Sequence, residues 1–202
     1  AGGSLIRAVR YSPRRGVSLL GVGPGGSGNA AQLALSTDGQ AVIIAAAGVD
    51  QLLVGHAQVR DTDALAVVHI DQGIRSVAWS SAGSQFAVAA GSSVRVYDTA
   101  THELAGDIAL NGTSGAVAYD PTGGLLAACN ETTAEIWFWD ARSFAVAGRA
   151  IELPAAVMNA AQNVAFSPDG SRLATGQNDG YVRLWDVETR RALGPAFEHG
   201  GL

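Results

Sequence analysis

The chain has 202 residues, of which 48% are hydrophobic, and it carries a formal net charge of -5. This apolar content is typical of a folded chain and not of a disordered one. All 13 basic residues are arginines scattered along the sequence, which excludes a basic stripe for nucleic acid, and the longest apolar run, residues 41–49, is too short to span a membrane.

The first expected strands lie within residues 1–21, in the stretch "IRAVRYSPRRGVSLLG". The next stretch, "GVGPGGSGNAA" at residues 21–31, matches the dinucleotide pattern G-x-G-x-x-G with Gly21, Gly23 and Gly26. A dinucleotide site needs a helix after these glycines, whereas the following "QLALSTDGQAVII" predicts two strands and a turn. The other phosphate loop requires a lysine, and the chain has none. We therefore interpret residues 21–31 as a connector.

Four units with one shared pattern follow this connector. In each unit an apolar strand leads into a turn with glycine, which tolerates the positive φ that such turns require. A second strand, a polar turn and a third strand come next, and a less regular fourth strand completes the unit. The units span residues 32–70, 75–110, 115–151 and 163–197, and their turn glycines, Gly39, Gly83, Gly123 and Gly170, lie 44, 40 and 47 residues apart.

This spacing predicts a β-propeller, because a period of about 40–45 residues is that of four-stranded propeller blades. Second strands such as residues 85–90 and 125–130 are almost continuously apolar and must be covered on both faces. No segment has helical periodicity long enough to supply that cover. We therefore expect an all-β fold with a single propeller domain over residues 1–202, made of four complete blades and an N-terminal half blade at residues 1–21.

The last unit carries a resemblance to a known family. Its stretch "FSPDGSRLATGQNDGYVRLWD", residues 166–186, resembles a blade of the WD-repeat β-propellers in its turn, in Asp179 and in the terminal Trp185-Asp186 pair. The stretch at residues 94–110 is also similar to repeats of surface-layer-type propellers. The WD-repeat resemblance implies closed rings of seven or eight blades, so we expect this chain to be part of a longer propeller.

The other units show the same signature to different degrees. The third strand ends in Trp139-Asp140 in one unit and in Tyr97-Asp98 in another, and we align Gly55-His56 with these pairs in the first full unit. The resemblance also implies a structural network of a Gly-His dipeptide, an Asp, a Ser or Thr and the Trp. In the last unit Asp179, Thr175 and Trp185 match three members of that network, whereas the preceding His is missing, so we expect an incomplete network.

In the WD-repeat family, partners usually dock on the face formed by the loops before the first strand and between the second and third strands. The resemblance places the following residues of this chain on that face: Gln32, Arg75, Ser114, Gln162 and Asn178.

Trp137, in "EIWFWD", stands where two other units have arginine, and this position has two interpretations. An exposed aromatic residue there would favour a binding hot spot, whereas packing between blades would make the residue structural. We favour the packing interpretation.

We expect no catalytic residue, no cofactor and no metal. The four histidines, His56, His69, His102 and His199, have no spacing typical of zinc ligands, and the single cysteine, Cys129, is expected to be a buried hydrophobe. The chain has no G-x-S-x-G motif of a nucleophilic serine.

We therefore expect a non-enzymatic scaffold or sensor platform that binds partner proteins, but not nucleic acid or membranes, as part of a longer cytoplasmic protein. The absence of lysine favours a bacterial source. One alternative is an enzymatic or ligand-binding propeller with a central-channel site, although the predicted innermost strands carry hardly any ionisable group. Another is a half-ring that dimerises into a closed propeller.

Overall fold

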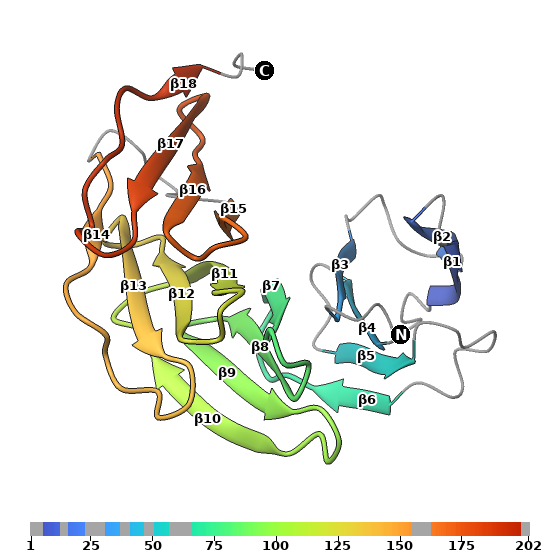
Figure 1. The fold of residues 1–202 in the computed structure, drawn as a ribbon. Helices are drawn as coiled ribbons and strands as arrows, with labels where there is room; N and C mark the ends of the chain where they lie inside the picture. Colours follow the sequence, from blue (N-terminus) through green and yellow to red (C-terminus); the bar gives the residue numbers. More distant parts are fainter. Residues whose placement is uncertain are drawn as a thin grey trace. The chain divides into compact units, whose positions relative to one another are not determined.

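The computed structural model describes residues 6–12, 16–22, 31–36, 41–46, 51–56, 66–154 and 163–198 (Figure 1). The sequence indicated one domain because the repeat pattern runs through the whole chain. The contacts divide the chain into two compact units, Ala1–Ile74 and Arg75–Leu202, which we describe separately. All regular structure in the described ranges is β-strand, as predicted, and no helix there is long and apolar enough to cross a bilayer.

The first unit contains a hairpin and one four-stranded antiparallel sheet. The hairpin, β1 (Ile6–Ser12) and β2 (Gly16–Val22), lies where the half blade was expected. The sheet has the order β3 (Ala31–Leu35), β4 (Ala41–Ala46), β5 (Gln51–His56) and β6 (Ala66–His69). Residues 23–30 of the glycine-rich connector lie outside the described residues.

The second unit contains three four-stranded sheets, each of which follows chain order. Their strands are β7 (Ile74–Trp79), β8 (Gln85–Ala90), β9 (Ser93–Asp98) and β10 (Leu104–Ala109); β11 (Ser114–Tyr119), β12 (Leu125–Asn130), β13 (Glu135–Asp140) and β14 (Ile151–Glu152); and β15 (Asn163–Phe166), β16 (Arg172–Gly176), β17 (Tyr181–Asp186) and β18 (Phe197–Glu198). With the sheet of the first unit, these make the four blades that the repeat predicted.

One register recurs in all four sheets. The last residue of the third strand pairs with the first residue of the second strand, and these pairs are Ala41 with His56, Gln85 with Asp98, Leu125 with Asp140 and Arg172 with Asp186. The alignment of Gly55-His56 with the aromatic-Asp pairs is therefore confirmed. Three of the predicted turn glycines have positive φ, namely Gly83 at 68°, Gly123 at 83° and Gly170 at 71°, while Gly39 lies outside the described residues.

The sheets of the second unit pack face to face through two apolar clusters. Val94 and Val96 of β9 pack with Leu126 of β12 and Trp139 of β13 in the first cluster. The second cluster joins the β11–β14 sheet to the β15–β18 sheet through equivalent positions, which include Ile136, Phe138, Leu173 and Trp185. Five of the six residues are buried in both β8 and β12, as expected for strands covered on both faces.

Each third strand of the second unit ends in the same turn. The Asp that closes the strand accepts hydrogen bonds from the backbone N–H and hydroxyl of a Ser or Thr three residues later, in the pairs Asp98–Thr101, Asp140–Ser143 and Asp186–Thr189. The residue after each Ser or Thr has a positive φ although it is not glycine: His102 at 59°, Phe144 at 57° and Arg190 at 59°. An Asx turn of this kind fixes the start of the connection to the fourth strand.

Candidate functional site

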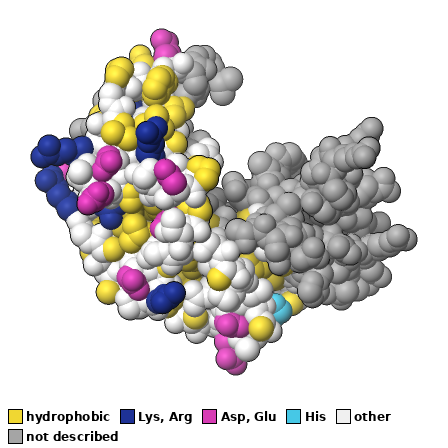
Figure 2. Space-filling view, viewed as in Figure 1, with side chains coloured by type: hydrophobic (Ala, Val, Ile, Leu, Met, Phe, Trp, Pro, Cys, Tyr) yellow, Lys and Arg dark blue, Asp and Glu magenta, His cyan; other side chains and the backbone are white. Residues whose placement is uncertain are grey.

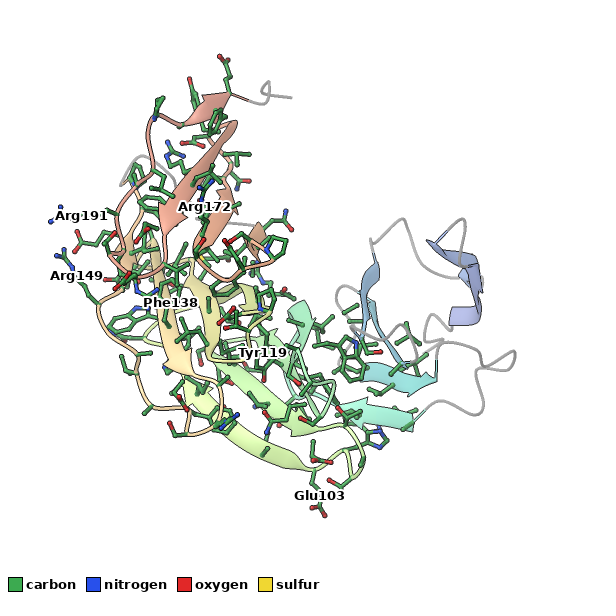
Figure 3. All side chains as sticks on the ribbon, in the orientation of Figure 1. Glu103, Tyr119, Phe138, Arg149, Arg172 and Arg191 are labelled. Carbon is green, nitrogen blue, oxygen red and sulfur yellow. The ribbon has the colours of Figure 1, made fainter. Side chains whose placement is uncertain are left out.

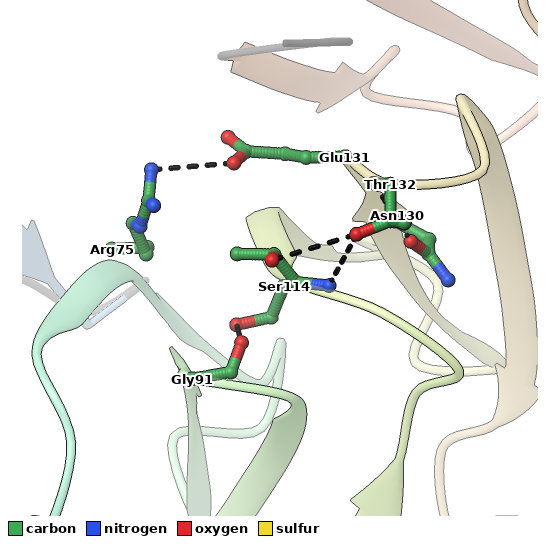
Figure 4. Close-up of polar contacts among 7 residues, drawn as sticks. Arg75, Gly91, Ser114, Asn130, Glu131 and Thr132 are labelled. Atoms are coloured by element: carbon green, nitrogen blue, oxygen red, sulfur yellow. Dashed lines mark hydrogen bonds and ion pairs between the residues drawn. The ribbon is translucent and has the colours of Figure 1, made fainter.

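The loops before the first strands and between the second and third strands meet at one edge of the second unit (Figure 4). Arg75, near the start of β7, lies with its Nη1 3.2 Å from Oε2 of Glu131, which belongs to the β12–β13 turn of the next sheet. The Arg75 side chain is 52% exposed, whereas that of Glu131 is only 13% exposed. The ion pair therefore connects neighbouring blades and presents a cation to solvent.

Hydrogen bonds within the β11–β14 sheet fix the turn that carries Glu131. The backbone N–H of Glu131 donates to the Thr113 carbonyl at 2.9 Å, and the Thr113 N–H donates to Thr132 Oγ1 at 2.9 Å. The Oδ1 atom of Asn130 accepts the Thr132 N–H at 3.0 Å, while its Nδ2 donates to the Asn111 carbonyl. We call these five residues together with Arg75 the Arg75–Glu131 surface.

The structure corrects the expected surface position of Ser114. This residue is fully buried. Its backbone N–H and its hydroxyl both donate to the Gly91 carbonyl, at 2.8 and 3.1 Å. Gly91 belongs to the β8–β9 turn of the preceding blade. Ser114 thus fastens two blades beneath the surface. A second such link runs from the Val117 N–H to Ser76 Oγ at 3.2 Å.

The other three residues predicted for this face lie in different parts of the chain. Asn178 is exposed in the β16–β17 turn. Gln32 lies on β3, in the first unit, and nothing is described of its side chain. Gln162 lies outside the described residues. The structure therefore brings Arg75 together with the loop that carries Glu131, a residue that sequence reasoning did not single out.

Trp137 is only partly exposed and packs against the apolar cluster between the first two sheets of the second unit. Its indole Nε1 donates to Glu135 Oε2 at 3.1 Å, which satisfies the polar atom of the ring. At the equivalent positions Arg95 and Arg183 are each 17% exposed and form ion pairs with Asp107 and Asp179. Trp137 therefore packs between blades, which is the interpretation that the sequence favoured.

The residues of the last blade that match the family's structural network, Thr175, Asp179 and Trp185, form two separate contacts. The Trp185 indole N–H donates to Thr175 Oγ1 at 3.0 Å, and both side chains are buried. Asp179 instead lies 2.6 Å from Nη2 of Arg183 and accepts the Tyr181 N–H at 3.0 Å. Burial raises the pKa of Asp179, but the Arg183 hydrogen bond and charge together with the Tyr181 N–H lower it overall.

The acidic, histidine and cysteine side chains in the described ranges form no cluster suited to a metal ion. No group of three His, Cys, Asp or Glu side chains is placed there to hold a metal ion. Cys129 is buried within the second apolar cluster. The strand-ending residues Asp140 and Asp186 have lowered pKa values because backbone N–H groups of their own turns donate to them.

Comparisons with known proteins agree with this geometry. The family model of the WD domain, G-beta repeat, matches residues 65–98 and 159–186. The Periodic tryptophan protein 2 homolog of Schizosaccharomyces pombe is 30% identical over 77 residues, which are 38% of this chain and 8% of that protein.

Among solved structures, the hydrazine synthase of Kuenenia stuttgartiensis superposes with a TM-score of 0.71 and 16% identity. The match covers 85% of this chain and 50% of the hydrazine synthase chain. At this identity the likeness concerns the fold alone. The chain thus spans a small part of one relative and half of the other.

Both segments that match the family model end where the third strand of a sheet ends. The second matched segment ends at Asp186, where β17 ends, and the first ends at Asp98, where β9 ends. Four-stranded antiparallel sheets with this shared register are the blades of a propeller. The chain therefore carries WD repeats at residues 65–98 and 159–186 within a β-propeller fold.

Proposed function

We propose that the chain is a non-enzymatic protein-interaction platform and that a partner protein docks on the Arg75–Glu131 surface. WD-repeat propellers typically act as such platforms. The observation that carries the proposal is the ion pair between Arg75 and Glu131, because it joins the first strand of one blade to a turn of the next and leaves the arginine half exposed. Arginine is enriched among the residues that dominate binding at protein interfaces.

The rigidity of this surface supports the proposal. Ser114 and Ser76 link neighbouring blades below it, and the Asn130 side chain holds the β12–β13 turn. A surface that is already ordered loses little conformational entropy when it binds a partner. The exposed hydroxyl and amide groups of Thr132 and Asn111 can then donate or accept hydrogen bonds without a change of backbone.

We place this platform in the bacterial cytoplasm, within a longer protein. The composition supports this part of the proposal, since all basic residues are arginines and a single cysteine cannot form a disulfide within the chain.

Site-specific photocrosslinking tests the proposed surface. Benzoylphenylalanine is placed at Thr132 in the full-length protein expressed in its own cells, and at Leu104, which is also exposed, as the control position on an outer strand. We expect a discrete crosslinked product from Thr132 that Arg75→Gln abolishes and that Leu104 does not give. Identical products from both positions, or no product from Thr132, would contradict the proposal.

A further inference from the structure

A pocket lined by three arginines lies between the last two blades of the second unit, away from the Arg75–Glu131 surface. Its volume is about 320 Å³, and it is lined by Arg149, Ala150, Glu152, Thr189, Arg190 and Arg191. We call it the arginine pocket. Figure 3 shows Arg149 and Arg191 projecting from the same side of the molecule, and Figure 2 shows arginine side chains gathered there.

Two of these guanidinium groups are available to a ligand. Arg149 Nη2 lies 2.9 Å from Glu152 Oε1, but the two side chains are 79% and 70% exposed. Exposed pairs of this kind contribute little to stability, so Arg149 can exchange Glu152 for another anion at small cost. Arg191 is exposed and has no ion pair within the described part of the chain.

Arg190 contributes a fixed positive charge at the base of the pocket. Its guanidinium carbon lies 3.5 Å from the centroid of the Phe138 ring, and its Nη2 donates to the Ala147 carbonyl at 3.1 Å. Its Nη1 is buried and has no hydrogen-bond partner among the described residues. Burial lowers the pKa of Arg190, whereas Asp186 raises it, and an arginine stays protonated at neutral pH. A charge partly removed from water is less screened than an exposed one.

The backbone beside the pocket also has free donors. The fourth strand of this blade is interrupted: Val146 forms an isolated bridge with Trp139, and regular pairing resumes at Ile151. Between them Gly148 has a φ of 82°, and no described residue accepts a hydrogen bond from the backbone N–H groups of residues 148–150. Such N–H groups add to the attraction for an anion.

We propose that the arginine pocket binds carboxylate groups of an acidic segment in a partner protein. The residues that line the pocket include three arginines and one glutamate, so the lining has a positive net charge. The chain as a whole has a net charge of -5. Guanidinium groups bind carboxylates in bidentate geometry. Nucleic acid is disfavoured because no basic stripe extends the pocket along a backbone of phosphates. The inference rests on the proposed function, since it supplies that platform with a second contact.

Fluorescence anisotropy with a labelled hexaglutamate peptide tests this site in the 202-residue chain at low ionic strength, with hexaglutamine as the uncharged probe. The decisive variant is Arg149→Gln/Arg191→Gln. The matched control is Arg142→Gln/Arg172→Gln, which removes the same charge from exposed positions outside the pocket. We expect hexaglutamate alone to bind, with an affinity that the pocket variant lowers by about tenfold or more and the control by less than about twofold.

Each other outcome overturns the inference. Equal losses in the two variants would mean nonspecific attraction, and no binding of hexaglutamate would mean that the pocket takes no carboxylate. Binding of inorganic phosphate that depends on Arg149 and Arg191, without binding of hexaglutamate, would assign the pocket to a small free anion. If Thr132 gives a crosslink and any of these results is also obtained, the proposed function is supported and only the role of the arginine pocket is rejected.

Discussion

The guanidinium of Arg190 lies over the ring of Phe138, a residue of the preceding blade, at 3.5 Å from the ring centroid. In the preceding blade the equivalent residue, Phe144, lies against Gly106 of β10. Both residues have positive φ and follow the Asp-x-x-Ser/Thr turn. In these two blades the turn therefore directs a side chain onto the blade before it.

Replacing Arg190 by Gln should lower the free energy of unfolding by about 1–2 kcal/mol, because it removes the cation–π contact and changes the hydrogen bond to Ala147. Urea unfolding of Arg190→Gln, Phe138→Leu and the double variant measures the coupling. If the two single effects simply add, Arg190 and Phe138 do not interact energetically.

Gly106→Ala should destabilise the chain by about 1–3 kcal/mol, because a Cβ there would lie 2.5 Å from the Phe144 ring. Gly73→Ala is the matched control, since a Cβ at Gly73 meets no atom within 4 Å. Thermal unfolding of both variants makes the comparison. Equal midpoints would show that the Phe144 ring moves aside at no cost.

Thr175→Val should cost about 1–3 kcal/mol, because the buried indole N–H of Trp185 would lose its acceptor. In a Trp185→Phe background the same change should cost much less, since no donor is then left unpaired. Chemical denaturation of the four proteins tests this, and an unchanged cost in the second background would assign the effect to packing.

Acid should destabilise the chain between about pH 4 and pH 2. A side-chain hydrogen bond from Ser167 and further bonds from Ser171 lower the pKa of Asp169 to about 2, and the Ser143 N–H and hydroxyl lower that of Asp140. A lowered folded pKa means that the stabilisation is complete above the ordinary value of 3.8 and is lost as the pH falls through the folded value.

The variants Asp169→Asn and Asp140→Asn keep a hydrogen-bond acceptor but do not titrate. Melting temperatures measured from pH 2 to pH 5 should therefore depend less on pH in these variants than in the unchanged chain. Parallel curves for variants and unchanged chain would show that other groups control the acid transition.

Ile151 and Phe197 occupy the same position in successive blades, opposite Ile136 and Val182, but Ile151 is 1% exposed and Phe197 54%. Ile151→Ser should cost about 2–5 kcal/mol, because it removes a filled core position. Phe197→Ser should change stability by about 0.5 kcal/mol or less. Denaturant midpoints measure both, and a large effect of Phe197→Ser would show that this residue is covered in solution.

The sequence by itself determined the blades. The spacing of Gly83, Gly123 and Gly170 and the strands that end at Asp98, Asp140 and Asp186 follow from local chemistry, because a turn with positive φ selects glycine and an apolar run selects a covered strand. These requirements act within one blade and are visible in any single repeat. The Asp-x-x-Ser/Thr spacing was also present in the sequence, and a search for Asx turns could have found it.

Contacts between blades were decided only by the tertiary structure. Nothing local distinguishes Ser114, which is buried against Gly91, from the exposed Arg75 that the same reasoning placed beside it. Glu131 meets Arg75, and Arg149 shares a pocket with Arg190 and Arg191, across more than 40 positions of the chain. Packing one sheet against the next brings such residues together. The sequence period determines which positions are equivalent, whereas the face-to-face stacking of the sheets determines which side chains touch.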